Sequence, residues 1–161
     1  MNRILGAVAA AAMILSPLAG PALAGPAEDA FLAKLVGTWT GTGSIKGGID
    51  GSMSCSLKFR AISDGVHFSG NCDVEGIGGQ SFSGDLSYND KAGRYEAHSP
   101  GGEVTVGTGR GKSIAFVSKL RGLAGTGTST MTLTASKISI DTDIVDSQSN
   151  KPSKSHVTFT K

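Results

Sequence analysis

The segment "GTGRGKS", from Gly107 to Ser113, has the residue types of a loop that binds nucleotide phosphates. Such a loop needs a glycine, four residues, Gly-Lys-Ser/Thr and then a helix, so that backbone N–H groups and the helix dipole reach the phosphates. Here Val106 occupies the position of the first glycine, and the residues after the segment alternate as in a β-strand. We therefore predict a three-residue hairpin loop over residues 109–111.

This hairpin also supplies two cations. We predict that Val106 lies opposite Ile114 and that both side chains point inward. Arg110 and Lys112 would then form a small cationic rim at a barrel mouth. Side chains of this kind bind carboxylate or phosphate head groups.

Three histidines could ligate a metal or a haem iron. Strand alternation turns His67 outward, and His98 lies at a strand end. His156 turns outward as well, because Val157 and Phe159 occupy the inward face of the last strand. We therefore expect no metal, no haem and no other cofactor.

Three aspartates, Asp141, Asp143 and Asp146, suggest a calcium site. Asp141 and Asp143 alternate with Ile140 and Ile144, which predicts that the aspartates lie on a solvated strand face. The segment also lacks the glycine and the distal glutamate of an EF-hand loop. No Ser-His-Asp or Cys-His set stands out, although paired-carboxylate catalysis stays open because a sequence does not show folded distances. We expect binding rather than catalysis.

The N-terminus has the pattern of a secretory signal peptide. Arg3 precedes an apolar run over residues 4–15, and small residues at Ala22 and Ala24 suit a signal peptidase. The run is shorter than the roughly 20 residues that cross a bilayer. We predict a cleaved leader over 1–24, one domain over 25–161 with no membrane span, and a periplasmic or secreted protein.

The charge balance argues against polyanionic partners. Without the leader the chain has 14 basic and 13 acidic residues, and only 17% of the whole sequence is charged. A nearly neutral domain has no strong electrostatic attraction to nucleic acid or to an anionic membrane.

One short helix and many strands follow the leader. Pro26, Glu28 and Asp29 are typical of a helix start, and Gly37 can end the helix. Period-two alternation then predicts strands at 38–45, 52–62, 66–75, 80–88, 93–99, 103–108, 112–120, 126–135, 137–145 and 154–160. Many short strands at regular spacing are typical of a sandwich or a barrel.

The alternation predicts a disulfide. Pairing Ala61 with Val66 across the first clear hairpin puts Phe59 opposite Phe68, since opposed antiparallel residues share a face. The same register brings Cys55 opposite Cys72. Two cysteines that meet in this way in an exported protein indicate a bridge.

The remaining alternation indicates a barrel with an apolar inside. The inward residues of the later strands include Phe82, Leu86, Tyr88, Tyr95, Ala97, Val104, Val106, Ile114, Phe116, Met131, Leu133, Ile138, Ile140, Ile144, Val157 and Phe159. The outward face is rich in Ser, Thr, Lys and Asp, which excludes an outer-membrane barrel. Glycines within strands allow bending or close approach. We predict an all-β fold, a closed antiparallel meander barrel of 8–10 strands with a short N-terminal helix.

Two segments resemble those of lipocalin-like (calycin) proteins. "LVGTWTGTG" contains Gly37-x-Trp39 after a helix and at the start of a strand, which resembles the opening motif of lipocalins. "YNDKAGRYEA" looks like a hairpin of small secreted lipocalin-like bacterial proteins. The resemblance implies that Gly37 and Trp39 are structural, with Trp39 packed against the helix. The last arginine is Arg121, so the closing arginine of true lipocalins is absent and the broader lipocalin-like class fits better.

The leading functional hypothesis is an exported barrel that binds a small apolar or amphipathic ligand without transforming it. The predicted lining combines inward apolar residues with the cationic rim: Met53, Phe59, Phe68, Phe82, Tyr88, Tyr95, Val106, Phe116, Arg110 and Lys112.

The alternative is a periplasmic protein-binding module, such as a protease or lysozyme inhibitor, with a solid barrel. Interior volume distinguishes the two, because a cavity of several hundred Å³ favours a ligand and a packed interior with exposed apolar loops favours a protein partner. Ile77 and Leu123 are the predicted apolar loop tips.

Overall fold

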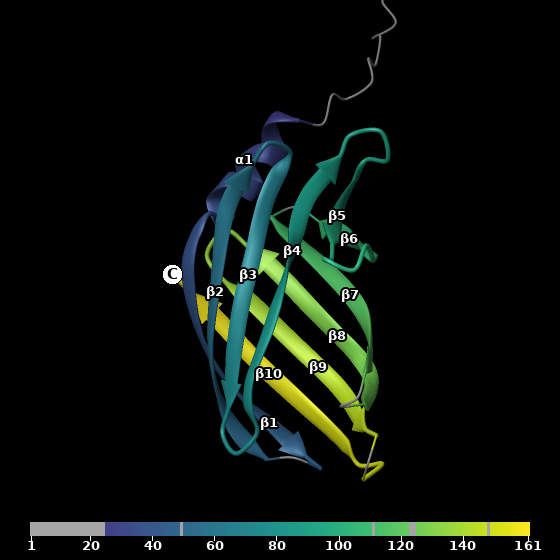
Figure 1. Cartoon of the computed structure of the whole chain (residues 1–161). Helices are drawn as coiled ribbons and strands as arrows, with labels where there is room; N and C mark the ends of the chain where they lie inside the picture. The colour runs from purple at the N-terminus through teal and green to yellow at the C-terminus, as the bar shows by residue number, and fades with distance from the viewer. Residues whose placement is uncertain (1–24, 49, 111, 123–124, 148) are drawn as a thin grey trace, which may run out of the picture.

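The computed structural model describes residues 25–161 except 49, 111, 123–124 and 148, so the predicted leader and Leu123 lie outside the described residues. The described chain contains one helix and ten strands (Figure 1). Their bounds are α1 (Pro26–Leu35), β1 (Gly37–Gly47), β2 (Gly51–Ile62), β3 (Gly65–Val74), β4 (Gly78–Asn89), β5 (Arg94–His98), β6 (Val104–Arg110), β7 (Ser113–Gly122), β8 (Gly125–Thr134), β9 (Ile138–Asp146) and β10 (Pro152–Thr160).

The strands form a closed antiparallel meander. Each strand pairs with the next along the chain, and β1 pairs with β10 to close the barrel. This confirms the predicted fold class and the predicted set of strands. Among the described residues, no helix has the length and apolarity that crossing a membrane requires.

Helix α1 covers one end of the barrel, which we call the helix end (Figure 1). Leu32 and Leu35 are buried there. The last residue of the chain holds the helix in place, because Lys161 Nζ donates to the carbonyl oxygens of Lys34 and Val36 at 2.6 and 3.0 Å. These carbonyls end the helix and have no intrahelical partner, so the ammonium group caps them.

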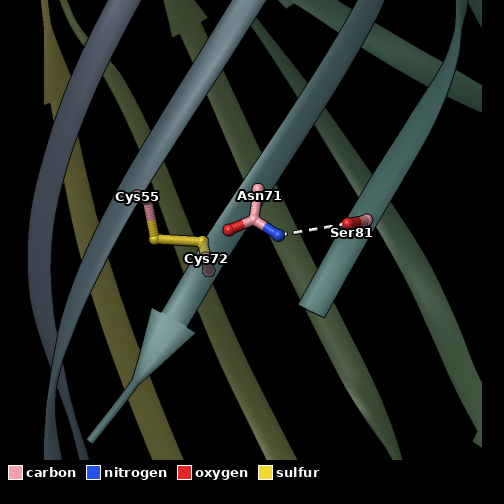
Figure 2. Close-up of a disulfide and its surroundings, with 4 residues drawn as sticks. All are labelled: Cys55, Asn71, Cys72 and Ser81. Atoms are coloured by element: carbon pink, nitrogen blue, oxygen red, sulfur yellow. Dashed lines mark hydrogen bonds between the residues drawn. A yellow bond between two sulfur atoms is a disulfide. The ribbon is translucent and has the colours of Figure 1, made fainter. Parts of the chain in front are cut away.

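The predicted hairpin register and the disulfide are confirmed. In the β2–β3 ladder Phe59 lies opposite Phe68 and Cys55 opposite Cys72. The two cysteines are bonded and their Cα atoms are 4.1 Å apart (Figure 2). The hydrophobic alternation was sufficient here because a slip by one residue would turn every apolar side chain to the outer face.

Inward glycines make room for phenylalanine rings. A Cβ atom at Gly107 would lie 2.6 Å from ring atoms of Phe116, so no larger residue fits without displacement. The same relation joins three more inward glycines to rings on neighbouring strands: Gly41 to Phe159, Gly70 to Phe82 and Gly84 to Phe68. Close approach of a ring explains these glycines, and at Gly84 the backbone carbonyl oxygen of His98 is closer still.

Strand β6 is oriented differently from the prediction. Gly107 lies opposite Phe116 and Arg110 opposite Ser113, so the predicted pairing of Val106 with Ile114 and the three-residue loop are wrong. Val104 and Val106 point outward, with 46% and 42% of their surface exposed. The physical reason is the space that Phe116 needs inside, which only the glycine at 107 leaves.

Candidate binding site

The inner half of the barrel next to α1 is packed. Trp39 is fully buried, and its indole Nε1 donates to the carbonyl oxygen of Leu35 at 2.8 Å. Lys161 Nζ lies 4.9 Å from the centre of the same ring, which adds a cation–π contact. The other core side chains that are at most 2% exposed are Leu32, Leu35, Leu57, Phe59, Val66, Leu86, Ile114, Phe116, Leu133, Ile138 and Phe159. This half is an ordinary close-packed core.

The inner half away from α1 is less completely buried. Val74 and Val157 are buried there, whereas four inward side chains are only partly buried and pack against the core: Met53, Phe82, Met131 and Ile140. We call this region, with the hydroxyl residues described next, the open half.

A belt of hydroxyl groups follows these apolar residues. Ser118, Ser129, Thr142 and Ser155 lie two positions beyond inward residues of β7 to β10, and each is partly buried. Thr105 Oγ1 lies 3.4 Å from Ser118 Oγ, and Ser129 Oγ lies 3.3 Å from Thr142 Oγ1. Each hydroxyl can donate and accept. The open half therefore offers an apolar zone beside a neutral polar one.

The wall of the barrel is incomplete beside the open half. Strands β5 and β6 are short and lie near the helix end (Figure 1). The β4–β5 ladder pairs residues 85–89 with 94–98. Among the described residues, 78–84 of β4 therefore have a ladder partner on the β3 side only.

The predicted lining residues fall into different environments in the structure. Phe59 and Phe116 are each 1% exposed and belong to the core. Phe68, like Met53 and Phe82, is partly buried against that core. Val106 lies on the outer face, so its predicted inward orientation is wrong.

The two tyrosines lie at the helix end. The rings of Tyr88 and Tyr95 meet edge-on with centroids 4.9 Å apart, and Phe31 of α1 lies 6.1 Å from Tyr95. Burial, with help from the charge of Glu28, raises the pKa of the Tyr95 phenol to about 12. These rings connect the helix to β4 and β5.

The predicted cationic rim does not lie beside the open half. Arg110 pairs with Ser113, and Ser113 pairs with Thr134, which places the β6–β7 hairpin at the helix end. Lys112 is exposed there. The Arg110 side chain lies outside the described part of the structure.

The outward histidines and aspartates pair with each other. His67 Nδ1 lies 2.7 Å from Asp85, and His156 Nδ1 lies 2.6 Å from Asp141. Asp143 pairs with Lys154 at 2.8 Å, as expected for a solvated strand face. Within the described ranges, no group of three or more His, Cys, Asp and Glu residues has the arrangement of a metal site.

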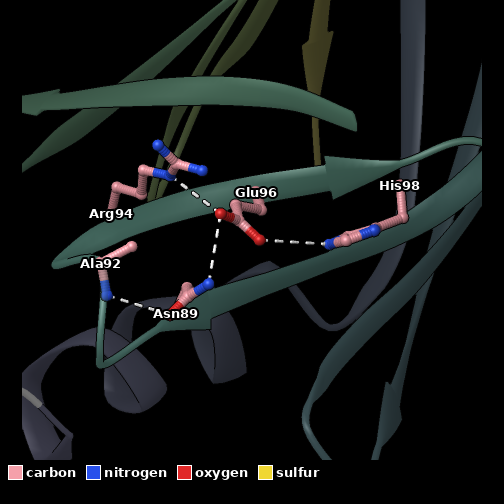
Figure 3. Close-up of polar contacts among 5 residues, drawn as sticks. All are labelled: Asn89, Ala92, Arg94, Glu96 and His98. Carbon is pink, nitrogen blue, oxygen red and sulfur yellow. Dashed lines mark hydrogen bonds and ion pairs between the residues drawn. The ribbon is translucent and has the colours of Figure 1, made fainter. Parts of the chain in front are cut away.

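A buried carboxylate on the outer face was not predicted. The side chain of Glu96 is only 10% exposed. It accepts from Arg94 Nε at 2.8 Å and Asn89 Nδ2 at 3.2 Å, and His98 Nε2 lies 3.5 Å away (Figure 3). Hydrogen bonds from Arg94 and Asn89 hold the pKa of this carboxyl below its ordinary value. The i, i+2 spacing of charges in "RYEAH" was the available sequence signal.

A hollow of about 780 Å³ lies on the outer face of β1 to β4 and is open to solvent. Its polar lining includes Ser56, Lys58, Ser69, Ser81 and Ser83, and Pro100 stands at its margin. Its position on the outer face could not be read from strand alternation, because it depends on sheet curvature and on where the turn after β5 lies.

The whole-chain geometry matches solved structures at low sequence identity. The S-type phycobiliprotein lyase CPES from Guillardia theta aligns with a TM-score of 0.57 and 12% identity, covering 82% of this chain and 90% of that one. Rv2717c from M. tuberculosis aligns with a TM-score of 0.58 and 15% identity, covering 85% of this chain and 98% of that one. The chain has a lipocalin-like fold. The sequence of this lipocalin-like barrel matches no protein-family model and no curated protein.

Proposed function

We propose that the lipocalin-like barrel binds a small amphipathic ligand in its open half, without transforming it. The observation that carries the proposal is the difference in burial inside the barrel. Leu35, Trp39 and Phe159 at the helix end are fully buried, whereas Met53, Met131 and Ile140 in the open half are only partly buried. Small-molecule sites are often found in the mouths of β-barrels.

The chemistry of the open half defines the ligand class. An apolar body would cover Met131 and Ile140 and remove their remaining surface from water. A neutral polar group would hydrogen-bond to Ser129, Thr142 or Ser155. Hydroxyl and thioether groups favour binding over proton transfer, which supports a carrier rather than an enzyme.

We further propose that the chain is exported after loss of residues 1–24. The Cys55–Cys72 bridge supports this, because disulfides persist in oxidising compartments. Intact mass of the protein recovered from an expressing bacterium would test it. Retention of residues 1–24 would contradict the proposal.

A fluorescence titration tests ligand binding. The purified protein is titrated with the dye 1-anilinonaphthalene-8-sulfonate and with unlabelled fatty alcohols as competitors. We expect Met131→Arg to abolish uptake, because a charge would enter the apolar zone. Val117→Arg is the matched control, since Val117 is 61% exposed on the outer face. Absence of uptake by the unmodified protein would refute the proposal.

A further inference from the structure

Residues 78–84 of β4 form a sheet edge in which positions 78–83 are exposed or half-buried, whereas Gly84 is buried beside the His98 carbonyl oxygen. They pair with β3 and, within the described structure, with no strand on the other side. Natural edges are commonly blocked by charged residues, proline or a bulge. This segment, "GGQSFSG", contains neither a charge nor a proline. The end of β7, by contrast, carries Lys119 and Arg121.

The two faces of this edge are chemically distinct. Ser81 and Ser83 point outward and line the 780 Å³ hollow, and Ser81 accepts a hydrogen bond from Asn71 (Figure 2). Phe82 points inward and packs against the core with part of its surface exposed. A strand added here would therefore place alternate residues beside hydroxyls and beside an aromatic ring.

One charge also faces the edge. Asp73 of β3 lies directly opposite Gly79 of β4. Its carboxylate is exposed and makes no ion pair or hydrogen bond with the described residues. Because Gly79 has no side chain, a long basic residue on an added strand could reach across it to Asp73. Lysine carries its charge at the end of a flexible four-carbon stem, which gives it this reach.

We propose that residues 78–84 accept an extended segment of another protein as an additional antiparallel strand. Its residues opposite Ser83 and Ser81 are small and polar, those opposite Phe82 and Gln80 are apolar, and the residue opposite Gly79 is basic. This protein-binding role uses the outer edge of β4 and does not depend on a ligand in the open half.

The first experiment uses the capped peptide "VSVTVKG" and the full domain. Hydrogen exchange measured by NMR should slow at amides within 78–84 when the peptide binds. Two versions of the peptide are then compared, each N-methylated at one of the two alternating sets of backbone amides. The affinities of these two peptides give the decisive comparison. Only one set can point toward β4, so one version should lose binding by at least tenfold and the other should keep it. Equal effects, or protection elsewhere on the barrel, would overturn the proposal.

The second experiment tests the charge. The Asp73→Asn substitution should lower the affinity for the lysine-containing peptide by about tenfold. It should leave unchanged the affinity for a peptide in which glutamine replaces the lysine. Asp64→Asn, in the exposed β2–β3 turn at the helix end, is the matched control. Protection of the same amides at rising protein concentration without peptide would show that a second copy occupies the edge, and would overturn the assignment to another protein. Dye uptake by Asp73→Asn should stay normal, which separates this test from that of ligand binding.

Discussion

The two halves of the barrel interior are built from the same alternating strands but differ in how their side chains pack. At the helix end, Gly41, Gly84 and Gly107 lie against rings on neighbouring strands, and Trp39 and Leu35 are fully buried. Away from the helix, hydroxyl residues replace the rings and the wall loses β5 and β6. The comparison indicates that stability resides mainly in the packed half, which leaves the open half available for the proposed ligand.

The largest expected effect comes from emptying the packed half. Trp39→Ala should lower the free energy of unfolding by about 3–5 kcal/mol, because it leaves a cavity in a close-packed core. Ile140→Ala, in the open half, should cost only about 1 kcal/mol, since part of that side chain is already in water. Urea unfolding of both variants measures the difference. Equal losses would show that the halves do not differ in packing.

Removing the disulfide should have the next largest effect. The bridge joins residues 17 positions apart, so the loop-entropy model predicts a loss of about 3 kcal/mol in the Cys55→Ala/Cys72→Ala double variant. Because β2 and β3 pair fully without it, the folded barrel should keep its β-sheet circular dichroism. A variant with native stability would show that the bridge constrains little of the unfolded chain.

The cap on α1 should matter less. Lys161→Met removes two hydrogen bonds to the end of the helix and should reduce stability by about 1 kcal/mol. Amides of α1 should then exchange faster, while those of β8 and β9 should not. Lys119→Met, an exposed lysine on β7, serves as the control. Unchanged exchange in α1 would rule out the capping role.

The smallest effect at neutral pH concerns Glu96. Its folded-state pKa is lowered from 4.5, so its stabilising contribution is present above about that pH and is lost as the pH falls below it. Glu96→Gln should therefore flatten the decline of the urea midpoint between pH 5 and pH 3. A decline equal to that of the unmodified protein would contradict this assignment.

Local alternation was enough for much of the fold. The β2–β3 register and the pairing of Cys55 with Cys72 followed from it, because each strand there has one consistently apolar face. It failed at β6, where Val104 and Val106 look like the inward pair. The other face carries only Thr105, Gly107 and Gly109, none of which has the apolar bulk of a core residue, so the alternation favoured the valine face.

The candidate site was only partly predictable. Met53, Phe68 and Phe82 were expected to line the inside, and they do face it, but Phe59 and Phe116 are sealed in the core. The hydroxyl belt was missed, because inward Ser and Thr residues look like solvent-facing ones. Glu96 was missed since its burial depends on Asn89, Arg94 and His98 folding over it.

By itself, the sequence determined the class of fold, the succession of strands and the disulfide, because these depend on side-chain alternation between neighbours along the chain. Only the tertiary structure decided which face of β6 packs inward, since Phe116 on the next strand needs the space over Gly107. Tertiary structure also decided that β5 and β6 are short and, within the described residues, leave 78–84 paired with β3 alone. Strand ends of this kind depend on the curvature of the whole closed sheet, which no local pattern contains.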